Sequence, residues 1–483
     1  MLYPFLKYSY ISARDNLFLY YIPNIQMSES YFFVGVAGVG MSALAQFLAG
    51  KGVEASGSDR RFEHSEGEQV KSQLQQAGVK CFLQDGSGVN KNLSAVVVST
   101  AIESGNPDTE AAKKLEIPII HRSELLAKIT SENPTIAVSG TSGKSTVTGL
   151  IWHILNECKK DPSLLSGAGL SVLEEQGKIG NAVAGKGWLV AEADESDGTL
   201  VRYSPKIGLV LNIDKDHKEL PELENLFAEF AANVRKVNGT LIVNGSHPLA
   251  LKLADEKTIL FGIENYKPNG ISSEFKISYD GESADFYLPL PGKHNAENAA
   301  AATAACRVAG VSLKECAEAL KTWKGIHRRS QIHNCKNGII LVDDYAHNPA
   351  KIAASIRSCQ DFAKGKLFAW FQPHGFGPTK FLKDDLVKEI SEVLRPSDEM
   401  WFSSIYYAGG TADRSFDSDI LSNALKEKGC NANFISNRDE CLKEIISRAK
   451  SGDVILLMGA RDPSLGEFSK GVYQEILSEI AQV

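Results

Sequence analysis

The chain has 483 residues, a formal net charge of −7 and a sequence pI of about 5.9, so it lacks the basic balance of nucleic-acid-binding proteins. Hydrophobic residues make up 43% and charged residues 23%, which is ordinary for a globular protein with room for about three domains. No apolar run is long enough to span a membrane, and the eight cysteines form no CxxC pair. We therefore expect a cytoplasmic protein with no membrane insertion, no nucleic-acid partner and no zinc or disulfide framework.

Residues 1–27 are rich in aromatic side chains, and Lys7, Arg14 and Asp15 interrupt every apolar run. The segment lacks the apolar core and the small-residue cleavage site of a signal peptide. We expect a flexible extension, with Met27 as a candidate start of translation.

The first unit, residues 28–133, begins with a strand-like run at 31–36 and continues into a turn that contains Gly38 and Gly40. Asp59 ends the next strand-like run. Glycines in such a turn let a pyrophosphate approach the backbone, and an acidic residue there accepts hydrogen bonds from a ribose. The spacing is G-x-x-G-x-G rather than G-x-G-x-x-G, so two alternatives stay open: a nicotinamide oxidoreductase and an ordinary α/β turn.

The central unit, residues 134–326, contains a phosphate-binding loop. The β-branched run at 134–138 is typical of a buried strand, and the apolar spacing after residue 146 predicts an amphipathic helix. Between them, Gly140 and Gly143 let backbone N–H groups face an anion, while Lys144 can reach terminal phosphates and the Ser145 hydroxyl can bind Mg²⁺. The pattern predicts nucleoside triphosphate binding, although a chance loop is the alternative because Val138 stands where a glycine is usual.

Polar clusters follow two further strand-like runs of the central unit, at 188–190 and 207–212. The clusters contain Glu192, Asp194, Glu195, Asp197, Asn212, Asp214, Asp216 and His217. Ligands bind at the carboxyl ends of parallel strands, and hard oxygen ligands suit Mg²⁺. Solvated acidic loops are the alternative.

The third unit, residues 327–483, has strand-like runs at 339–343, 367–371 and 453–458. Strand and helix patterns alternate through most of the chain, which indicates an α/β fold with parallel sheets. An Ala-rich helix is expected at 297–309 in the central unit.

Taken in order, the motifs resemble those of the Mur ligases over about residues 31–480. The segments that carry the resemblance are GVAGVGMSALA, GSD, VVVSTAIESGNP, IPIIHRSELLA, GTSGKST, AEADESDGT, NIDKDH, PGKHNAENAAAA, HRRS, VDDYAHNP and FQPH. The resemblance implies a Rossmann-like domain that binds a UDP-sugar, a central P-loop ATPase-type domain, and a Rossmann-like domain that binds the acceptor amino acid.

The resemblance also implies roles for individual residues. The UDP-sugar would contact Gly38, Gly40, Met41, Ser42, Asp59, Ser99, Ser196, Asp197 and Thr199. ATP would contact Gly140, Thr141, Ser142, Gly143, Lys144, Ser145, Thr146, His294, Asn295, Asn298, Arg329 and Asp344. Catalysis would depend on Lys144, Glu192, His217, Arg329 and His347, and Mg²⁺ would bind Ser145, Glu192 and His217.

The implied reaction activates the carboxylate of UDP-N-acetylmuramic acid as an acyl phosphate, which the amine of an amino acid then attacks. L-Alanine is the first candidate acceptor, and a monomer or a dimer is expected. A recycling ligase that attaches a whole peptide and a paralogue with another acceptor stay open, as does a nucleotide-binding regulator without catalysis.

Several positions depart from the branch of the family that adds L-alanine. Ser142 stands where a histidine is usual, Asn348 replaces a second histidine, and Arg461 stands where a glycine is usual. After His374, Gly375 and Pro378 occupy the places of two arginines that hold the acceptor. We therefore expect a changed acceptor site in which His374, Lys380 or Arg461 contributes.

Overall fold

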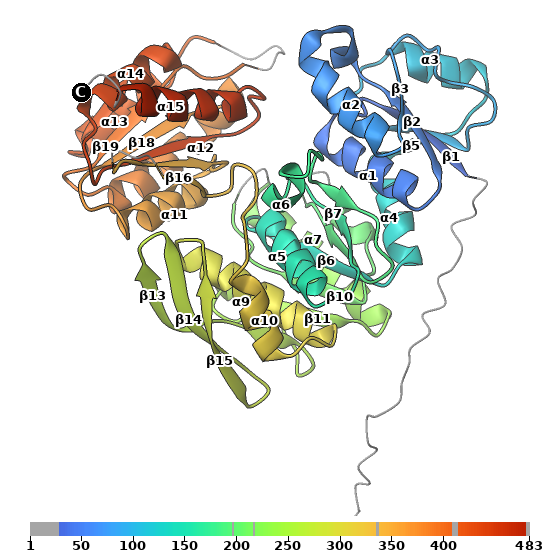
Figure 1. Ribbon diagram of the computed structural model, residues 1–483, viewed down its shortest axis with the longest axis horizontal. Helices are drawn as coiled ribbons and strands as arrows, with labels where there is room; N and C mark the ends of the chain where they lie inside the picture. The colour runs from blue at the N-terminus through green and yellow to red at the C-terminus, as the bar shows by residue number, and fades with distance from the viewer. Residues whose placement is uncertain (1–28, 196–197, 216–217, 335–337, 408–413, 480–483) are drawn as a thin grey trace, which may run out of the picture.

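The computed structural model describes residues 29–195, 198–215, 218–334, 338–407 and 414–479. The predicted extension at 1–27 lies outside these residues, as do Ser196, Asp197 and His217 of the predicted site. In Figure 1 the first unit (blue) and the third unit (orange to red) lie on opposite sides above the central unit (green to yellow). The three-unit division of the chain remains a proposal.

The first unit is a parallel sheet of order β3-β2-β1-β4-β5 flanked by helices, as its alternating pattern predicts. Its strands are β1 (Ser30–Val34), β2 (Glu54–Ser58), β3 (Lys80–Phe82), β4 (Ala95–Val98) and β5 (Ile119–His121). Its helices are α1 (Val39–Gly50), α2 (Glu68–Gln76), α3 (Pro107–Lys114), α4 (Arg122–Glu132) and the short 3₁₀ turns η1 (Arg60–Glu63) and η2 (Ser65–Gly67). The central strand β1 is buried along its length because helices cover both faces of the sheet.

The central unit has a larger sheet of order β12-β11-β10-β6-β9-β7-β8, parallel except for the β7–β8 pair. Its strands are β6 (Thr135–Ser139), β7 (Ser163–Leu165), β8 (Ala182–Val183), β9 (Leu189–Glu192), β10 (Ile207–Val210), β11 (Thr240–Asn244) and β12 (Ile259–Phe261). Its helices and 3₁₀ turn are α5 (Lys144–Glu157), α6 (Ser171–Glu174), η3 (Thr199–Arg202), α7 (Leu220–Lys236), α8 (Pro248–Leu251), α9 (Lys293–Val308) and α10 (Leu313–Leu320). The predicted Ala-rich helix is α9, which begins four residues earlier than expected, directly after Gly292 with φ 98°.

An antiparallel sheet interrupts the parallel architecture, and the sequence analysis did not predict it. Its strands are β13 (Glu264–Asn269), β14 (Ser272–Tyr279) and β15 (Glu282–Leu288). The alternating residues Phe275 and Ile277 join Phe286 in the same hydrophobic core as α9 and α10. The sheet therefore extends the core of the central unit towards the third unit (Figure 1).

The third unit has a sheet of order β16-β17-β21-β18-β19-β20, parallel except for the β16–β17 pair. Its strands are β16 (Gln331–Asn334), β17 (Ile340–Asp344), β18 (Leu367–Gln372), β19 (Glu399–Phe402), β20 (Ala432–Phe434) and β21 (Val454–Gly459). Its helices are α11 (Pro349–Gln360), α12 (Phe376–Val393), α13 (Asp419–Glu427), α14 (Arg438–Arg448) and α15 (Leu465–Glu479). The predicted strands of this unit are confirmed, and β18 is buried throughout, as its continuous apolar run implies.

The first and central units are joined through one face of α1. Asn181 donates hydrogen bonds to the Val39 carbonyl and to Ser42 Oγ, each at 2.9 Å, and its Oδ1 accepts one from Gln46. The hydrophobic core of the first unit also includes Leu165 from β7. This contact fixes the glycine turn that precedes α1 relative to the central sheet.

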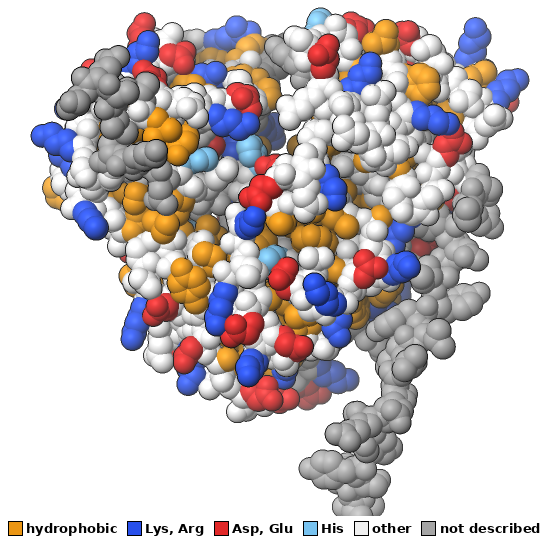
Figure 2. Space-filling view, viewed as in Figure 1, with side chains coloured by type: hydrophobic (Ala, Val, Ile, Leu, Met, Phe, Trp, Pro, Cys, Tyr) orange, Lys and Arg blue, Asp and Glu red, His pale blue; other side chains and the backbone are white. Residues whose placement is uncertain are grey.

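The surface is hollowed between the first and third units, and charged side chains gather at that hollow (Figure 2). Within the part of the chain that the structure describes, no helix combines the length and the apolar character needed to cross a membrane.

Candidate active site

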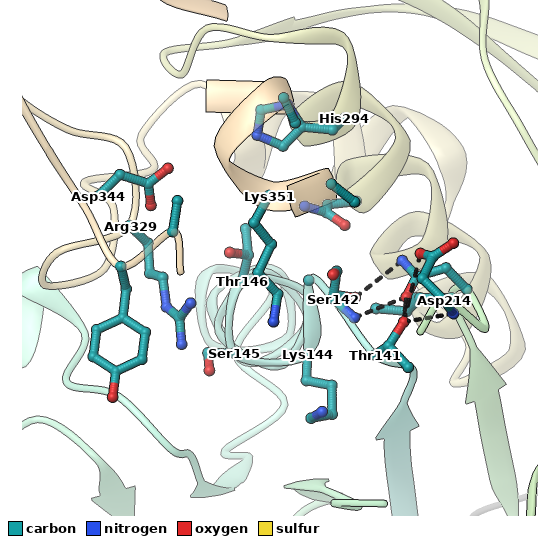
Figure 3. Close-up of a pocket in the computed structure, with 18 of the residues that line it drawn as sticks. Thr141, Ser142, Lys144, Ser145, Thr146, Asp214, His294, Arg329, Asp344 and Lys351 are labelled. Carbon is teal, nitrogen blue, oxygen red and sulfur yellow. Dashed lines mark hydrogen bonds between the residues drawn. The ribbon is translucent and has the colours of Figure 1, made fainter. Parts of the chain in front are cut away.

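A cavity of about 500 Å³ lies between the central and third units. The carboxyl ends of β6, β9 and β10 form one side, and the segments that follow β17, β18 and β21 form the other. The predicted site residues that line it are Thr141, Ser142, Gly143, Lys144, Ser145, Thr146, Glu192, His294, Asn295, Asn298, Arg329, Asp344, His347, His374 and Arg461. The structure thus brings together residues that lie more than 300 positions apart in the sequence. Figure 3 shows part of this lining, from Thr141 to Lys351.

The phosphate loop between β6 and α5 owes its shape to two glycines in the left-handed region. Gly140 has φ 139° and Gly143 has φ 86°. A Cβ at Gly143 would lie 2.6 Å from Asn298 Oδ1, so a side chain there is also excluded by space. The loop is therefore pressed against α9, which brings Asn298 to the phosphate end of the cavity.

Asn212 holds the loop from the neighbouring strand. Its Oδ1 accepts hydrogen bonds from the Ser142 backbone N–H at 2.8 Å and from Thr141 Oγ1 at 2.9 Å, and its Nδ2 donates to the Ser142 carbonyl. Thr141 Oγ1 also accepts from the Asp214 N–H. Asn212 and Asp214 of the second polar cluster therefore position the loop, while Asp216 and His217 of that cluster lie outside the described residues.

Lys144 lies in a carboxylate-rich part of the cavity. Its Nζ donates to the Gly140 carbonyl at 2.8 Å and to Glu195 Oε2 at 2.7 Å, and it lies 3.6 Å from Asp194 Oδ1. Burial alone would lower the pKa of Lys144, but Glu195 and Asp194 outweigh burial and raise it. Burial raises the pKa of Glu195, and Lys144 opposes that shift. Lys144 is thus a fixed cation, and Glu195 is its counter-ion.

Two adjacent arginines at the start of the third unit have different environments. Arg328 is buried: its Nε lies 3.0 Å from Asp343 Oδ1, and its Nη2 donates to the Gly459 carbonyl. Burial raises the pKa of Asp343 to about 6, although Arg328 opposes the shift. Arg329 lines the cavity instead, with its guanidinium 4.6 Å from the centre of the Tyr345 ring. Figure 3 shows Arg329 directed into the same space as Lys144.

The opposite end of the cavity has a polar wall from α9 and α11. Asn295 Nδ2 donates to the Pro291 carbonyl at 2.7 Å, which secures the start of α9. Asp344 accepts hydrogen bonds from the Ser330 N–H and from Ser355 Oγ. Burial lowers the pKa of His294, and Asp344 opposes the shift. His294, Asn295 and Asp344 are among the residues for which the resemblance implies contact with ATP.

The implied Mg²⁺ can be tested against its described ligands. The Ser145 hydroxyl and the Glu192 carboxylate line the same cavity, while His217 lies outside the described residues. Gly167 N–H and Ser166 Oγ donate to Glu192 Oε1, which orients the carboxylate. The described residues contain no cluster of three His, Cys, Asp or Glu that could hold a metal alone. A hydroxyl and a carboxylate fit Mg²⁺, because this ion takes part of its shell from water and phosphate.

Lys351 lines the cavity and was missed by the sequence analysis. It lies in the first turn of α11, where its backbone N–H donates to Asn348 Oδ1. Its side chain extends towards the phosphate loop, between Arg329 and Ser142 (Figure 3). The available signal was its place directly after the turn at 345–349, within the first turn of a helix.

Among the predicted UDP-sugar residues, Gly38, Gly40, Met41, Ser42 and Asp59 lie apart from this cavity, in or beside the turn before α1. Met41 is buried in the core, and Ser42 Oγ donates to the Val39 carbonyl. Asp59 Oδ2 accepts from the Ala37 N–H at 3.0 Å, so Asp59 braces the turn. Ser99 follows β4 at the same edge of the sheet, and Thr199 begins η3.

Arg122 is a second residue that the sequence analysis missed. It directly follows β5 at the carboxyl edge of the first sheet. A Cβ built at Gly40 would lie only 2.9 Å from Arg122 Nη1, so the guanidinium lies over the glycine turn. A cation at this place matches the pyrophosphate that the turn predicts.

The residues predicted to contact the acceptor do not all lie in the cavity. Arg461 and His374 line the cavity, whereas Lys380 is exposed on α12 and is absent from its lining. Gly375 has φ 71°, and a Cβ there would lie 3.2 Å from Pro378 Cδ. An arginine at position 375 would be strained in this backbone.

Comparisons with known proteins agree with this geometry over most of the chain. Three family models match: the Mur ligase family catalytic domain at 30–133, the Mur ligase middle domain at 138–306, and the Mur ligase glutamate ligase domain at 328–461. The chain is 32% identical over 455 residues to the UDP-N-acetylmuramate–L-alanine ligase of Clostridium acetobutylicum, covering 90% of this chain and 96% of the relative. It is 33% identical over 445 residues to the same ligase of Carboxydothermus hydrogenoformans, covering 89% and 93%.

Solved structures show the same fold. The UDP-N-acetylmuramate-alanine ligase MurC of Thermotoga maritima aligns with a TM-score of 0.73 at 24% identity, over 94% of this chain and 99% of that one. A murein peptide ligase of Psychrobacter arcticus aligns with a TM-score of 0.64 at 22% identity, again over 94% and 99%. Family models, relatives and fold agree from the first sheet to the last, and the chain belongs to the Mur ligase family.

Proposed function

We propose that this protein is an ATP-dependent ligase of peptidoglycan biosynthesis that joins the carboxylate of UDP-N-acetylmuramic acid to the amine of an amino acid. L-Alanine is the first acceptor to test, because relatives that align over about nine-tenths of the chain are named for it. One observation carries the proposal: Lys144, Ser145, Glu192 and Arg329 surround one cavity between two units. Because its substrates are ATP and a nucleotide sugar, we expect the reaction in the cytoplasm.

The proposed first step is phosphoryl transfer to the sugar carboxylate. A carboxylate oxygen attacks the γ-phosphorus of ATP, the bond to the β-phosphate oxygen breaks, and ADP leaves. Lys144 and Arg329 enter the cavity from the central and third units and would offset charge on the phosphoryl oxygens. Bound Mg²⁺, held by Ser145 and Glu192, would supply further positive charge at the phosphates.

The second step forms the amide. The acceptor amine attacks the acyl carbon, a tetrahedral intermediate forms, and phosphate leaves as the amine loses a proton. His347 lies at the third-unit side, with Nδ1 2.8 Å from the Tyr345 carbonyl oxygen. In the tautomer in which Nδ1 of His347 carries the proton, Nε2 can accept one. We assign Nε2 as the group that takes the proton from the acceptor amine. Closure of the cavity between two units would keep water from the acyl phosphate.

The UDP end is assigned to the turn before α1. Gly38 and Gly40 leave space for a pyrophosphate, Asp59 braces the turn, and Arg122 supplies a cation over it. This assignment rests on the fold and the position of the turn. Arg122→Ala should raise the KM for the UDP-sugar by about 10-fold or more, the cost of a lost charged hydrogen bond, while the KM for ATP stays unchanged.

Ligation should be measured as phosphate release from ATP with UDP-N-acetylmuramic acid and single amino acids, with product masses determined. A product heavier by one amino-acid residue supports the proposal, and a product carrying a peptide after addition of peptides alone would support the recycling reaction. No phosphate release with any acceptor would contradict ligation and favour the regulator. An absorbance change with NAD(P)H would instead favour the oxidoreductase.

A further inference from the structure

A second cavity, of about 290 Å³, lies within the third unit beside the active site. It is lined by His347, Phe371, Pro373, His374, Gly377, Pro378, Thr379, Phe381, Leu382 and Leu386. Apart from the two histidines and Thr379, these described lining residues are apolar or glycine. A cavity with this mainly apolar lining suits an apolar group.

The two cavities share a wall. His347 and His374 line both, and the centres of their rings are 5.5 Å apart. The phosphoryl chemistry lies on one side of this wall, at Lys144 and Arg329, and the apolar space lies on the other. An amino acid whose amine reaches the larger cavity past these histidines would therefore direct its side chain into the smaller one.

The smaller cavity is open because of the residues at the start of α12. Gly377 lies in the first turn of the helix, and a Cβ built there would meet no atom within 4 Å. Leu382 and Leu386 lie one turn apart on the same helix and close the apolar side. A methyl group would leave most of this volume unfilled, whereas a branched or aromatic side chain would contact these leucines.

The rim of the cavity meets the central unit. Lys215 follows β10, and its Nζ lies 4.5 Å from the centre of the Phe381 ring. Phe381 is 52% exposed although it lines the cavity, so the lysine stem and the ring form part of the rim together. The cavity is thus bordered by both units that must come together around the acceptor.

We propose that the smaller cavity receives the side chain of the acceptor, and that the enzyme ligates apolar amino acids larger than alanine as well as L-alanine. This inference rests on the proposed ligase function and specifies its acceptor class. It commits to a free amino acid with an aliphatic or aromatic side chain, because the lining is mainly apolar.

The experiment measures kcat/KM for L-alanine, L-valine, L-leucine and L-phenylalanine in the full chain, with UDP-N-acetylmuramic acid and ATP saturating and product masses determined. We expect the value for L-leucine to lie within about tenfold of the value for L-alanine, because an apolar pocket gains from each methylene that it accommodates. The variant Gly377→Leu should fill the cavity and lower the leucine-to-alanine ratio of kcat/KM by about tenfold or more.

Gly471→Leu is the matched control. Gly471 is also exposed in a helix, α15, and a Cβ built there also meets no atom within 4 Å, but it lines neither cavity. This variant should leave the ratio and both activities unchanged, and Gly377→Ala provides a milder filling variant.

The outcomes separate the two proposals. Ligation of L-alanine alone, or a ratio that Gly377→Leu and Gly377→Ala leave unchanged, would overturn the inference and leave the ligase intact. Phosphate release with none of the amino acids would overturn the proposed function and the inference together. A leucine product whose formation Gly377→Leu reduces selectively would support both.

Discussion

The two ends of the active-site region differ in chemical character. At the phosphate end, Lys144, Glu195 and Arg329 are charged and are held by hydrogen bonds or ring contacts. At the acceptor end, Leu382 and Leu386 line an apolar space. ATP presents the same charges to any ligase, so the residues that bind it are constrained, whereas the acceptor end can change with the substrate. Family resemblance is therefore a better guide to the first end than to the second.

Removing the fixed cation should have the largest effect at the phosphate end. Lys144→Met should lower kcat by about 10²–10³-fold, the loss typical of one preorganised donor to developing charge. The binding of UDP-N-acetylmuramic acid should change little, because we assign the UDP end of this substrate to the first unit. Phosphate release under saturating ATP, together with direct binding of the sugar, checks this expectation.

The stability of this variant needs a separate control. Lys144→Met leaves the buried Glu195 without its counter-ion, so the melting temperature should fall. The double variant Lys144→Met with Glu195→Gln removes the orphaned charge and should recover stability without recovering activity. Recovery of activity in the double variant would show that Lys144 acts only through folding.

The adjacent arginines give the next prediction. Arg329→Ala should lower kcat by about 10²-fold, because its guanidinium faces the phosphates, and should change the melting temperature little. Arg328→Met should instead change kcat little and lower the free energy of unfolding by about 3–5 kcal/mol near neutral pH. The reason is that it leaves the buried Asp343 carboxylate unpaired. Phosphate release and thermal unfolding distinguish the two roles.

The Arg328 variant should also show a characteristic pH dependence. Burial already raises the pKa of Asp343 to about 6, and loss of Arg328 should raise it further above its value in the unfolded chain. A carboxyl group with a raised folded-state pKa stabilises at low pH, and that contribution is lost as the pH rises. The stability difference from wild type should therefore grow between pH 5 and pH 8, and a constant difference would contradict the assignment.

The parallel sheets and the phosphate end could be predicted from sequence for a physical reason. A glycine loop between a buried strand and a helix has few other uses, and Lys144 and Ser145 follow it in the first turn of α5, which is buried on all faces from Ser145 to Leu155 and is not the amphipathic helix that the sequence predicted. The antiparallel sheet was missed although its turns were visible. Gly270-Ile271 and Asp280-Gly281 stand between its strands, and Asp280 and Gly281 both have positive φ, as a tight hairpin requires.

The residues that the sequence analysis missed lie far in the sequence from the groups that they approach in the fold. Lys351 and Arg122 each follow a strand end, but only the folded chain shows that one faces the phosphate loop and the other covers Gly40. The apolar cavity was not predicted for another reason: Gly375 and Pro378 were interpreted only as the places of two missing arginines. The space that Gly377 leaves open has no sequence signature of its own.

Substitution of Lys351 tests how much one further cation near the phosphate loop contributes to ATP binding. Lys351→Ala should raise the KM for ATP by about 10-fold or more, which corresponds to the loss of one hydrogen bond to a charged group. Arg357→Ala removes a positive charge from the exposed side of the same helix and serves as the control. Equal effects of the two substitutions would mean that only the overall charge of α11 matters.

Substitution of Arg461 tests whether a residue that lines the larger cavity also contacts the acceptor. It lines the larger cavity, and its φ of 59° is unfavourable for a residue with a side chain. Such strain is kept where the side chain has a task. We expect Arg461→Gly to raise the KM for the acceptor by about 10-fold, because it removes the charged side chain that we assign to the α-carboxylate.

The same substitution should stabilise the fold by about 0.5–1 kcal/mol, because glycine relieves the left-handed backbone at some cost in chain entropy. Arg461→Ala keeps the strain and should raise the KM without the gain in stability, so the pair separates binding from backbone. Lys380 is exposed on α12 and lines neither cavity, so Lys380→Ala should raise the acceptor KM less than Arg461→Ala does. A larger effect at Lys380 would move the carboxylate contact from the strand end of β21 to α12, and the acceptor would then enter along the helix.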